Sequence, residues 1–106
     1  MGFFDFLLPQ DINKGFEEYG QTQNAILVDV RTTEEYAAGH LPGSVNIPVD
    51  RIGEAWNRFA DKDVPLFVYC RSGRRSRKAV NTLELLGFTC VKNIGGMEDY
   101  EGEVEG

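Results

Sequence analysis

Residues 64–87 read VPLFVYCRSGRRSRKAVNTLELLG, and this stretch decides the fold. Its opening run, VPLFVY, is continuously apolar, as is typical of a strand buried on both faces of a sheet. The segment from Ser76 to Gly87 instead places apolar side chains such as Ala79 and Leu83 at helical spacing, with the glycine as a stop. A buried strand that leads through a short loop into an amphipathic helix predicts an α/β domain.

The rest of the chain repeats this alternation of strand and helix. Short apolar runs predict further strands at 25–30 (AILVDV) and 88–94 (FTCVKNI). Between and around them we expect helices at 11–20, 32–39 and 50–59, a loop at 40–48 with at most a brief strand around Val45, and a last turn at 95–100. This order predicts a three-layer α/β fold, in which helices cover both faces of a central, mostly parallel sheet of about four or five strands.

Local signals predict where the helices begin and end. Asp11 is expected to cap the first helix and Gly20 to stop it. Thr32 and Glu35 have the spacing of a capping box, and Asp50 is expected to cap the third helix. The side chains expected to face the core from these helices are Ile12, Phe16, Tyr19, Ile52, Ala55, Trp56 and Phe59.

Length and charge limit the class of protein. At 106 residues the chain is long enough for one domain with its own core, assigned to residues 11–100. Residues 1–10 form an apolar arm expected to pack on the domain or on a second subunit, and residues 101–106 form an acidic tail expected to be frayed. A net charge of −6 argues against general binding to nucleic acid or to an anionic membrane, because both need a broad basic face.

Targeting and ligand signals predict a cytoplasmic protein that needs no cofactor. The start, MGFFDFLLPQ, lacks the basic region and small-residue cleavage site of a signal peptide, and Phe6 replaces the Ser or Thr of a myristoylation signal. No apolar run is long enough to cross a bilayer. The two cysteines, Cys70 and Cys90, have neither the number of a disulfide framework nor the spacing of a metal site, so no metal is expected.

The loop at Cys70 concentrates positive charge in an otherwise acidic protein. Five of the eleven Lys and Arg residues fall within eight consecutive positions after this cysteine. Ligands of open α/β sheets gather at the carboxyl ends of the strands, which is where Cys70 lies. Gly73 lets the backbone curl, so that its amides and those of a helix beginning near Ser76 form an anion-binding nest. We therefore expect a reactive Cys70 thiolate, with Arg77 and Lys78 on the exposed side of the helix.

Two chemistries use a cysteine in such a nest, namely phosphate-ester cleavage and sulfur transfer. A purely structural cysteine is the alternative, but cations at a helix N-terminus oppose the helix dipole and need a reason. Cysteine phosphatases place five residues between Cys and Arg, whereas this chain has Ser76 at that position, with Arg75 one short of it and Arg77 one beyond. The shorter loop favours sulfur transfer, because it closes around one sulfur atom more readily than around a phosphoryl group.

Three stretches together resemble single-domain rhodaneses, which are sulfurtransferases of the thiosulfate and persulfide type. They are DVRTTEEYAAGHLPGSVNIP (29–48), YCRSGRRS (69–76) with the helix after it, and LLGFTCVKNIGGMEDY (85–100), so that the likeness covers residues 11–100. The resemblance implies the rhodanese fold, a central parallel sheet flanked by helices. It also implies a six-residue active loop made of Cys70, Arg71, Ser72, Gly73, Arg74 and Arg75.

The resemblance further implies ping-pong sulfur transfer with Cys70 as the catalytic residue. Its thiolate would take the outer sulfur of a donor such as thiosulfate, and the persulfide would pass that sulfur to a thiol, a protein cysteine or cyanide. Substrate binding is expected from Arg71, Ser72, Gly73, Arg74, Arg75 and Ser76. The alternatives are a persulfide carrier or binding module without turnover, and a Cys-loop phosphatase or arsenate reductase.

Other polar residues in these stretches are expected to be structural. His40 is expected to be a hydrogen-bonded loop residue rather than a general base. Arg31 and Glu35 are four residues apart and expected to pair with each other, while Asp29 could orient backbone near the active loop. Cys90 is expected to be buried and inert, with a disulfide to the active-loop cysteine as the alternative.

Overall fold

The computed structural model describes residues 10–106, so the predicted apolar arm lies, apart from Gln10, outside the described residues. Its centre is a sheet of four strands, β1 (Ile26–Asp29), β2 (Val45–Asn46), β3 (Leu66–Cys70) and β4 (Val91–Gly96). The strands lie in the order β2-β1-β3-β4, and each neighbouring pair is parallel. The predicted parallel sheet is therefore confirmed, including the brief strand around Val45.

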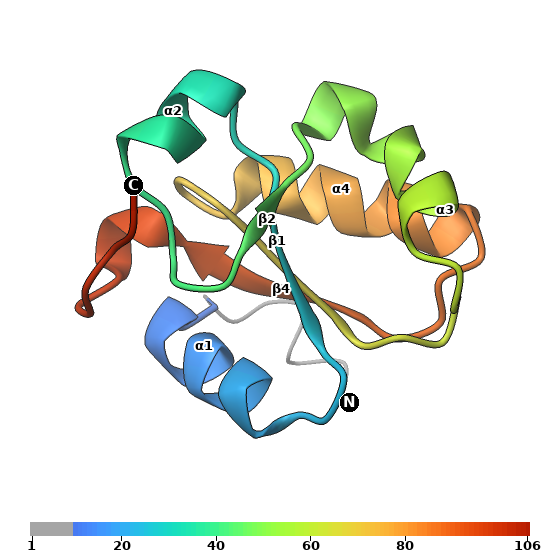
Figure 1. Ribbon diagram of the computed structural model, residues 1–106, viewed down its shortest axis with the longest axis horizontal. Helices are drawn as coiled ribbons and strands as arrows, with labels where there is room; N and C mark the ends of the chain where they lie inside the picture. The colour runs from blue at the N-terminus through green and yellow to red at the C-terminus, as the bar shows by residue number, and fades with distance from the viewer. Residues whose placement is uncertain (1–9) are drawn as a thin grey trace.

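Helices cover both faces of this sheet, as Figure 1 shows. On one face α1 (Ile12–Gln21) packs against β3 and β4. The other face carries α4 (Arg74–Leu85), with the 3-10 helix η2 (Val49–Glu54) and the short α3 (Ala55–Arg58) beside it. The two remaining elements are α2 (Thr33–Ala38), which follows β1, and the 3-10 turn η3 (Met97–Asp99), which follows β4. The predicted three-layer fold is confirmed.

Alternate side chains of β3 point into two separate hydrophobic cores. Leu66, Val68 and Cys70 belong to the cluster on the α4 side of the sheet, whereas Phe67 and Tyr69 belong to the cluster on the α1 side. All five residues of the strand are buried, which explains why the sequence is apolar without alternation. The last side chain of the strand, that of Cys70, therefore faces α4.

Two predicted helix starts are confirmed by their capping bonds. The Asp11 carboxylate accepts hydrogen bonds from two backbone N–H groups of the first turn of α1, at 3.0 and 3.4 Å. Thr32 and Glu35 form the predicted capping box of α2, since each side chain accepts a hydrogen bond from the other's backbone N–H.

Two other expectations about the helix ends are wrong. Helix α1 passes Gly20, and the chain leaves the helical path only at Thr22, which adopts extended dihedral angles. Asp50 does not cap the third helix, because η2 already begins at the preceding residue, directly after Pro48 and with no side-chain cap.

The outer side of α3 also differs from expectation. Trp56, expected in the core, is 49% exposed, and its ring carries the Lys62 ammonium group 4.1 Å from the centroid. The backbone of η2 is non-helical at Arg51, which shifts the face that the following residues present. Phe59 does pack against the core, as predicted. The last strand begins at Val91, later than predicted.

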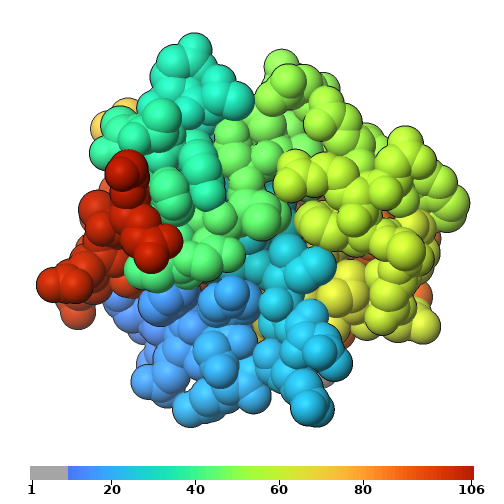
Figure 2. Space-filling view, viewed as in Figure 1, coloured from blue at the N-terminus to red at the C-terminus, as the bar shows by residue number. Residues whose placement is uncertain are grey.

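The acidic tail lies on the surface but is attached to the domain. Glu105 forms an antiparallel bridge with His40, in which each backbone N–H donates to the other's carbonyl oxygen, at 2.7 and 2.9 Å. The Glu105 carboxylate also accepts a hydrogen bond of 3.3 Å from the backbone of Gly43. Figure 2 shows the C-terminal residues lying against the segment that follows α2. The expectation of a frayed tail is therefore wrong.

The helices of the part described here are short. None of them, within residues 10–106, has the length and apolar character needed to cross a membrane.

Candidate functional site

Cys70 lies at the carboxyl end of β3, a central strand of the sheet. Its backbone pairs with Gly96 of the neighbouring strand, and the residue has no exposed surface. Strand ends of this kind are where open α/β folds place their ligand sites. The cysteine is thus held by the sheet on one side and by the loop and α4 on the other.

The loop after Cys70 directs polar hydrogens at its sulfur. The N–H groups of Gly73 and Ser76 donate to Sγ at 3.0 and 3.4 Å, and the Ser76 hydroxyl lies 3.4 Å from the same atom. Gly73 has a φ of 94°, a left-handed conformation that glycine adopts without strain. Helix α4 therefore begins at Arg74, earlier than predicted, and the Ser76 amide belongs to its first turn, where N–H groups lack helical partners.

These contacts set the ionisation of the thiol. Burial opposes formation of a thiolate, but hydrogen bonds from the Ser76 side chain and from the backbone of Ser76, Gly73 and Ser72 outweigh it and lower the pKa of Cys70 below its ordinary value. A lowered pKa favours the nucleophilic form of the sulfur. The arrangement can therefore hold a sulfur-centred anion.

The arginines of the loop fall into two groups. Arg71 and Arg74 are exposed, as are Arg77 and Lys78, whose exposure was predicted. Arg75 is engaged: its guanidinium donates to both carboxylate oxygens of Glu35, at 2.6 and 3.0 Å. The positive charge of Arg75 also interacts with Cys70, so the ion pair holds a cation near the sulfur.

The predicted pair between Arg31 and Glu35 is wrong. Arg31 instead pairs with Asp29, to which its guanidinium donates through Nε at 3.1 Å and through Nη2 at 2.7 Å. The same Nη2 donates to the carbonyl of Gly39 at 2.7 Å. Arg31 lies just before α2, so the helical spacing rule does not apply to it. The Asp29 carboxylate accepts bonds from Arg31 and does not touch the active loop in the described contacts.

Asn93 is a residue of the site that sequence reasoning missed. Its Nδ2 donates to the carbonyl of Gly73 at 3.2 Å, while its Oδ1 accepts from the Ser76 hydroxyl at 2.8 Å and from the Gly95 backbone at 2.9 Å. Asn93 thus supports the active loop from β4. The available signal was an uncharged amide near the carboxyl end of that strand, where open α/β folds place their ligand sites.

Gly96 allows the active loop to lie directly on β4. A side chain at this position would collide with the backbone of Arg71 and Ser72. The loop is held there by a hydrogen bond of 3.1 Å from the Glu98 backbone N–H to the Arg71 carbonyl. The two glycines after Asn93 are therefore part of the platform under the loop.

His40 is a hydrogen-bonded loop residue, as predicted. Its ring stacks on the ring of Tyr36 with the centroids 3.7 Å apart, and its Nδ1 lies 2.8 Å from the backbone carbonyl oxygen of Tyr36.

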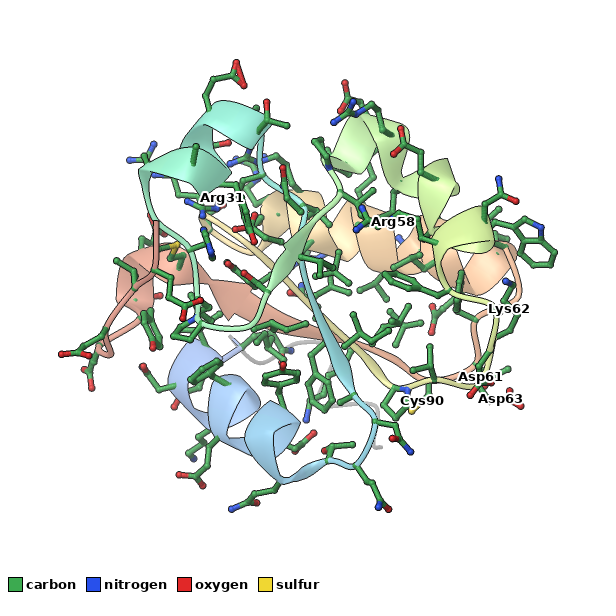
Figure 3. All side chains as sticks on the ribbon, viewed as in Figure 1. Arg31, Arg58, Asp61, Lys62, Asp63 and Cys90 are labelled. Carbon is green, nitrogen blue, oxygen red and sulfur yellow. The ribbon has the colours of Figure 1, made fainter. Side chains whose placement is uncertain are left out.

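Cys90 is exposed, so the prediction of a buried cysteine is wrong. It lies just before β4, and its carbonyl accepts a hydrogen bond from Leu66 at the start of β3. Four strand residues, or about 13 Å, separate Leu66 from Cys70. A disulfide needs Cα atoms within about 7 Å, so Cys90 cannot resolve Cys70 in this fold. Thr89, the residue before Cys90, donates to the Asp63 carboxylate at 2.7 Å. Figure 3 shows Cys90 on the side of the molecule away from Arg31.

The ion pair of Glu35 with Arg75 gives a testable pH dependence. Arg75 lowers the pKa of Glu35 from 4.5 to about 2, so the folded state binds this proton less readily than the unfolded chain does. The stabilisation is complete above the unfolded pKa and is lost as the pH falls towards 2. We expect Glu35→Gln to reduce the loss of unfolding free energy between about pH 6 and about pH 2.5, measured by urea titration.

The control for this measurement is Glu17→Gln, which changes an exposed glutamate of α1. It should leave the difference between the two pH values close to that of the unaltered protein. An equal pH dependence in Glu35→Gln and in the unaltered protein would contradict the assignment.

The comparison with protein families identifies the class. Residues 9–103 match the Rhodanese-like domain, and the chain belongs to that family. It is 32% identical to the rhodanese-like domain protein from Staphylococcus aureus, whose crystal structure superposes with a TM-score of 0.77 over 92% of this chain and 95% of that one.

Two curated relatives carry names from sulfur metabolism. The putative sulfur carrier protein YrkF of Bacillus subtilis is 39% identical over 74% of this chain, and thiosulfate sulfurtransferase PspE of Escherichia coli is 38% identical over 68% of it. The chain spans 43% of the length of YrkF and 70% of that of PspE. Together with the family match, these names support sulfur transfer as the general class of function.

Proposed function

We propose that this protein is a sulfurtransferase that carries sulfur as a persulfide on Cys70. The observation that carries the proposal is the set of hydrogen-bond donors, the N–H groups of Gly73 and Ser76, aimed at a Cys70 sulfur whose pKa is lowered. The proposed donor is thiosulfate or a persulfide, and the proposed acceptor is a small thiol, a protein cysteine or, in an assay, cyanide.

The first half-reaction is a displacement at sulfur. The Cys70 thiolate attacks the outer sulfur of thiosulfate, a new S–S bond forms, and the old one breaks with its electron pair leaving on sulfite. In the second half-reaction the acceptor thiolate attacks the terminal sulfur. The Cys70 thiolate then departs with its electron pair, and the acceptor keeps the extra sulfur.

The residues of the loop have different proposed roles. The amides of residues 71–76 stabilise the anionic sulfur, as backbone donors do in oxyanion holes. Arg71 and Arg74 have exposed guanidinium groups that are available to the sulfonate end of thiosulfate. Arg75 is bound to Glu35 and supplies its positive charge beside the sulfur rather than a free donor.

Sulfur loading tests the proposal directly. The reduced protein is incubated with thiosulfate and its intact mass is measured, with Cys90→Ser as the matched variant that leaves one thiol. We expect both proteins to gain the mass of one sulfur atom, to lose it on treatment with dithiothreitol, and to form thiocyanate when cyanide is added. Absence of the mass gain from both thiosulfate and an organic persulfide would overturn the proposal.

A persulfide carrier is the second candidate. The identity to YrkF, a putative sulfur carrier by name, and the full burial of the Cys70 sulfur support it. A carrier would load sulfur stoichiometrically but release it slowly to cyanide and to small thiols. Hydrolysis of p-nitrophenyl phosphate without any loading would instead favour the phosphatase alternative, which the short loop disfavours.

A further inference from the structure

The Ser76 hydroxyl has one hydrogen and two neighbours that can accept it. One neighbour is the Cys70 sulfur, 3.4 Å from Oγ, and the other is the Asn93 amide oxygen, 2.8 Å from Oγ. A serine hydroxyl donates only one hydrogen bond but accepts others. Its oxygen can therefore receive a hydrogen from the thiol only while its own hydrogen points at Asn93.

The orientation of the Asn93 amide decides which arrangement holds. Its Nδ2 donates to the Gly73 carbonyl, and its Oδ1 accepts from the Gly95 backbone N–H. Rotating the amide by half a turn would set its NH₂ group against the N–H of Gly95 and its oxygen against the carbonyl of Gly73. The amide is therefore fixed with its oxygen towards Ser76, and that oxygen can only accept.

Ionisation of Cys70 changes the Ser76 hydroxyl from an acceptor of the thiol hydrogen to a donor to the sulfur. A thiolate has no hydrogen to give, and it gains from a hydrogen bond that Ser76 can supply only by turning away from Asn93. We propose that Asn93 is a positioning residue that holds the Ser76 hydroxyl hydrogen while Cys70 is a thiol and releases it to the sulfur when the thiolate forms.

The charged groups around Cys70 lie outside this chain of hydrogen bonds. From α4, α2, the end of β1 and the loop, they are Arg75, its partner Glu35, the Asp29–Arg31 pair, and the exposed Arg71 and Arg74. Asn93 and Ser76 are neutral. An effect that requires both of them therefore reports the hydroxyl rather than these charges.

We call this movement of the Ser76 hydroxyl hydrogen between Asn93 and the Cys70 sulfur the switch. It has a role in sulfur transfer, and this role rests on the proposed function. When Cys70 carries an extra sulfur, the negative charge lies on the terminal atom and Sγ becomes a weak acceptor. The Ser76 hydrogen then returns to Asn93. The hydrogen bond from Ser76 therefore stabilises the Cys70 thiolate only while it carries no extra sulfur. Because Asn93 competes for the same hydrogen, the stabilisation is limited, and the thiolate stays nucleophilic.

A double-mutant cycle on the pH profile of alkylation tests the switch without any sulfur donor. In a Cys90→Ser background, the rate of reaction of Cys70 with iodoacetamide is measured against pH for the parent, Ser76→Ala, Asn93→Leu and the double variant. Ser76→Ala should raise the midpoint of the rate-against-pH curve, because the Cys70 thiolate loses the hydroxyl as a hydrogen-bond donor. Leucine matches asparagine in shape but accepts no hydrogen bond, so it frees the Ser76 hydrogen for the sulfur.

The coupling between the two substitutions is the quantity that tests the switch. Asn93→Leu also removes the bond to the Gly73 carbonyl and the bond from the Gly95 backbone N–H, but these losses are present with or without Ser76 and cancel in the cycle. We expect the midpoint change caused by Asn93→Leu to be more negative by about half a pH unit or more when Ser76 is present than when it is absent. Additive midpoint shifts would overturn the proposal, whatever the outcome of sulfur loading.

A second measurement covers the case in which Asn93→Leu fails to fold. The infrared S–H stretching band of Cys70, recorded below the midpoint, reports whether the thiol donates to Ser76. We expect the band at lower frequency in the parent than in Ser76→Ala, because a donating S–H bond is weakened. Equal frequencies would show that the thiol does not donate to Ser76, and the proposal would fall.

Discussion

Cys70→Ser is expected to abolish both sulfur loading and thiocyanate formation, with a loss of rate of at least about 10³-fold. A serine hydroxyl at this position would meet the same amides of Gly73 and Ser76, but at neutral pH it does not ionise as a thiol does, and it forms no persulfide. Intact mass after incubation with thiosulfate and a thiocyanate assay with cyanide measure the two effects.

Cys90→Ser is the matched control for this experiment, since it removes the exposed thiol before β4 and leaves the site unchanged. It should retain both loading and turnover. Both variants should give the far-ultraviolet circular dichroism spectrum of the unaltered protein, because serine is close to cysteine in size. Sulfur loading that survives in Cys70→Ser and disappears in Cys90→Ser would show that Cys90 carries the sulfur and would contradict the assignment to Cys70.

Asp29→Ala is expected to lower the free energy of unfolding by about 3–5 kcal/mol. The substitution leaves the Arg31 guanidinium in the interior without its carboxylate, because Asp29 has no exposed surface and the Arg31 side chain is only 8% exposed. A domain of this size is stable by about 5–15 kcal/mol, so a large part of its stability is at stake. Urea titration at neutral pH gives the change.

An ion pair of similar length on the surface supplies the comparison. Lys92 and Glu18 lie 2.9 Å apart with side chains 46% and 50% exposed, so Glu18→Ala should cost no more than about 1 kcal/mol. The gap between the variants then measures what burial and the additional hydrogen bonds of Asp29 add together. A loss in Asp29→Ala as small as that in Glu18→Ala would show that Arg31 finds water or another partner.

Patterns local in the sequence predicted most of the fold. The apolar run before Cys70 indicated a strand buried on both faces, and the capping box at Thr32 and Glu35 predicted the start of α2. These signals depend on neighbours along the chain, so no knowledge of the tertiary structure was needed. The same holds for the glycine after Ser72, whose left-handed conformation turns the loop into α4.

The partners of long polar side chains could not be predicted in this way. Arg31 pairs with Asp29 and Glu35 with Arg75, because the end of β1 is buried and α2 lies over the active loop. Asn93 joins the site only because β4 lies beside β3. The contacts of Glu35 and Asn93 follow from packing between distant segments, and the Asp29–Arg31 pair, although local, follows from burial of the end of β1.

The Cys70 sulfur has no surface open to solvent, and this has a consequence for rate. A donor reaches an atom without exposed surface only after neighbouring atoms have moved aside, so we expect the rate to depend on the fraction of molecules in which the sulfur is accessible. The measured rate is then the intrinsic rate multiplied by that fraction. An acceptor protein that binds preferentially to the form with an accessible sulfur would raise the fraction of that form by its binding alone. It would therefore receive sulfur faster than a small thiol of equal reactivity.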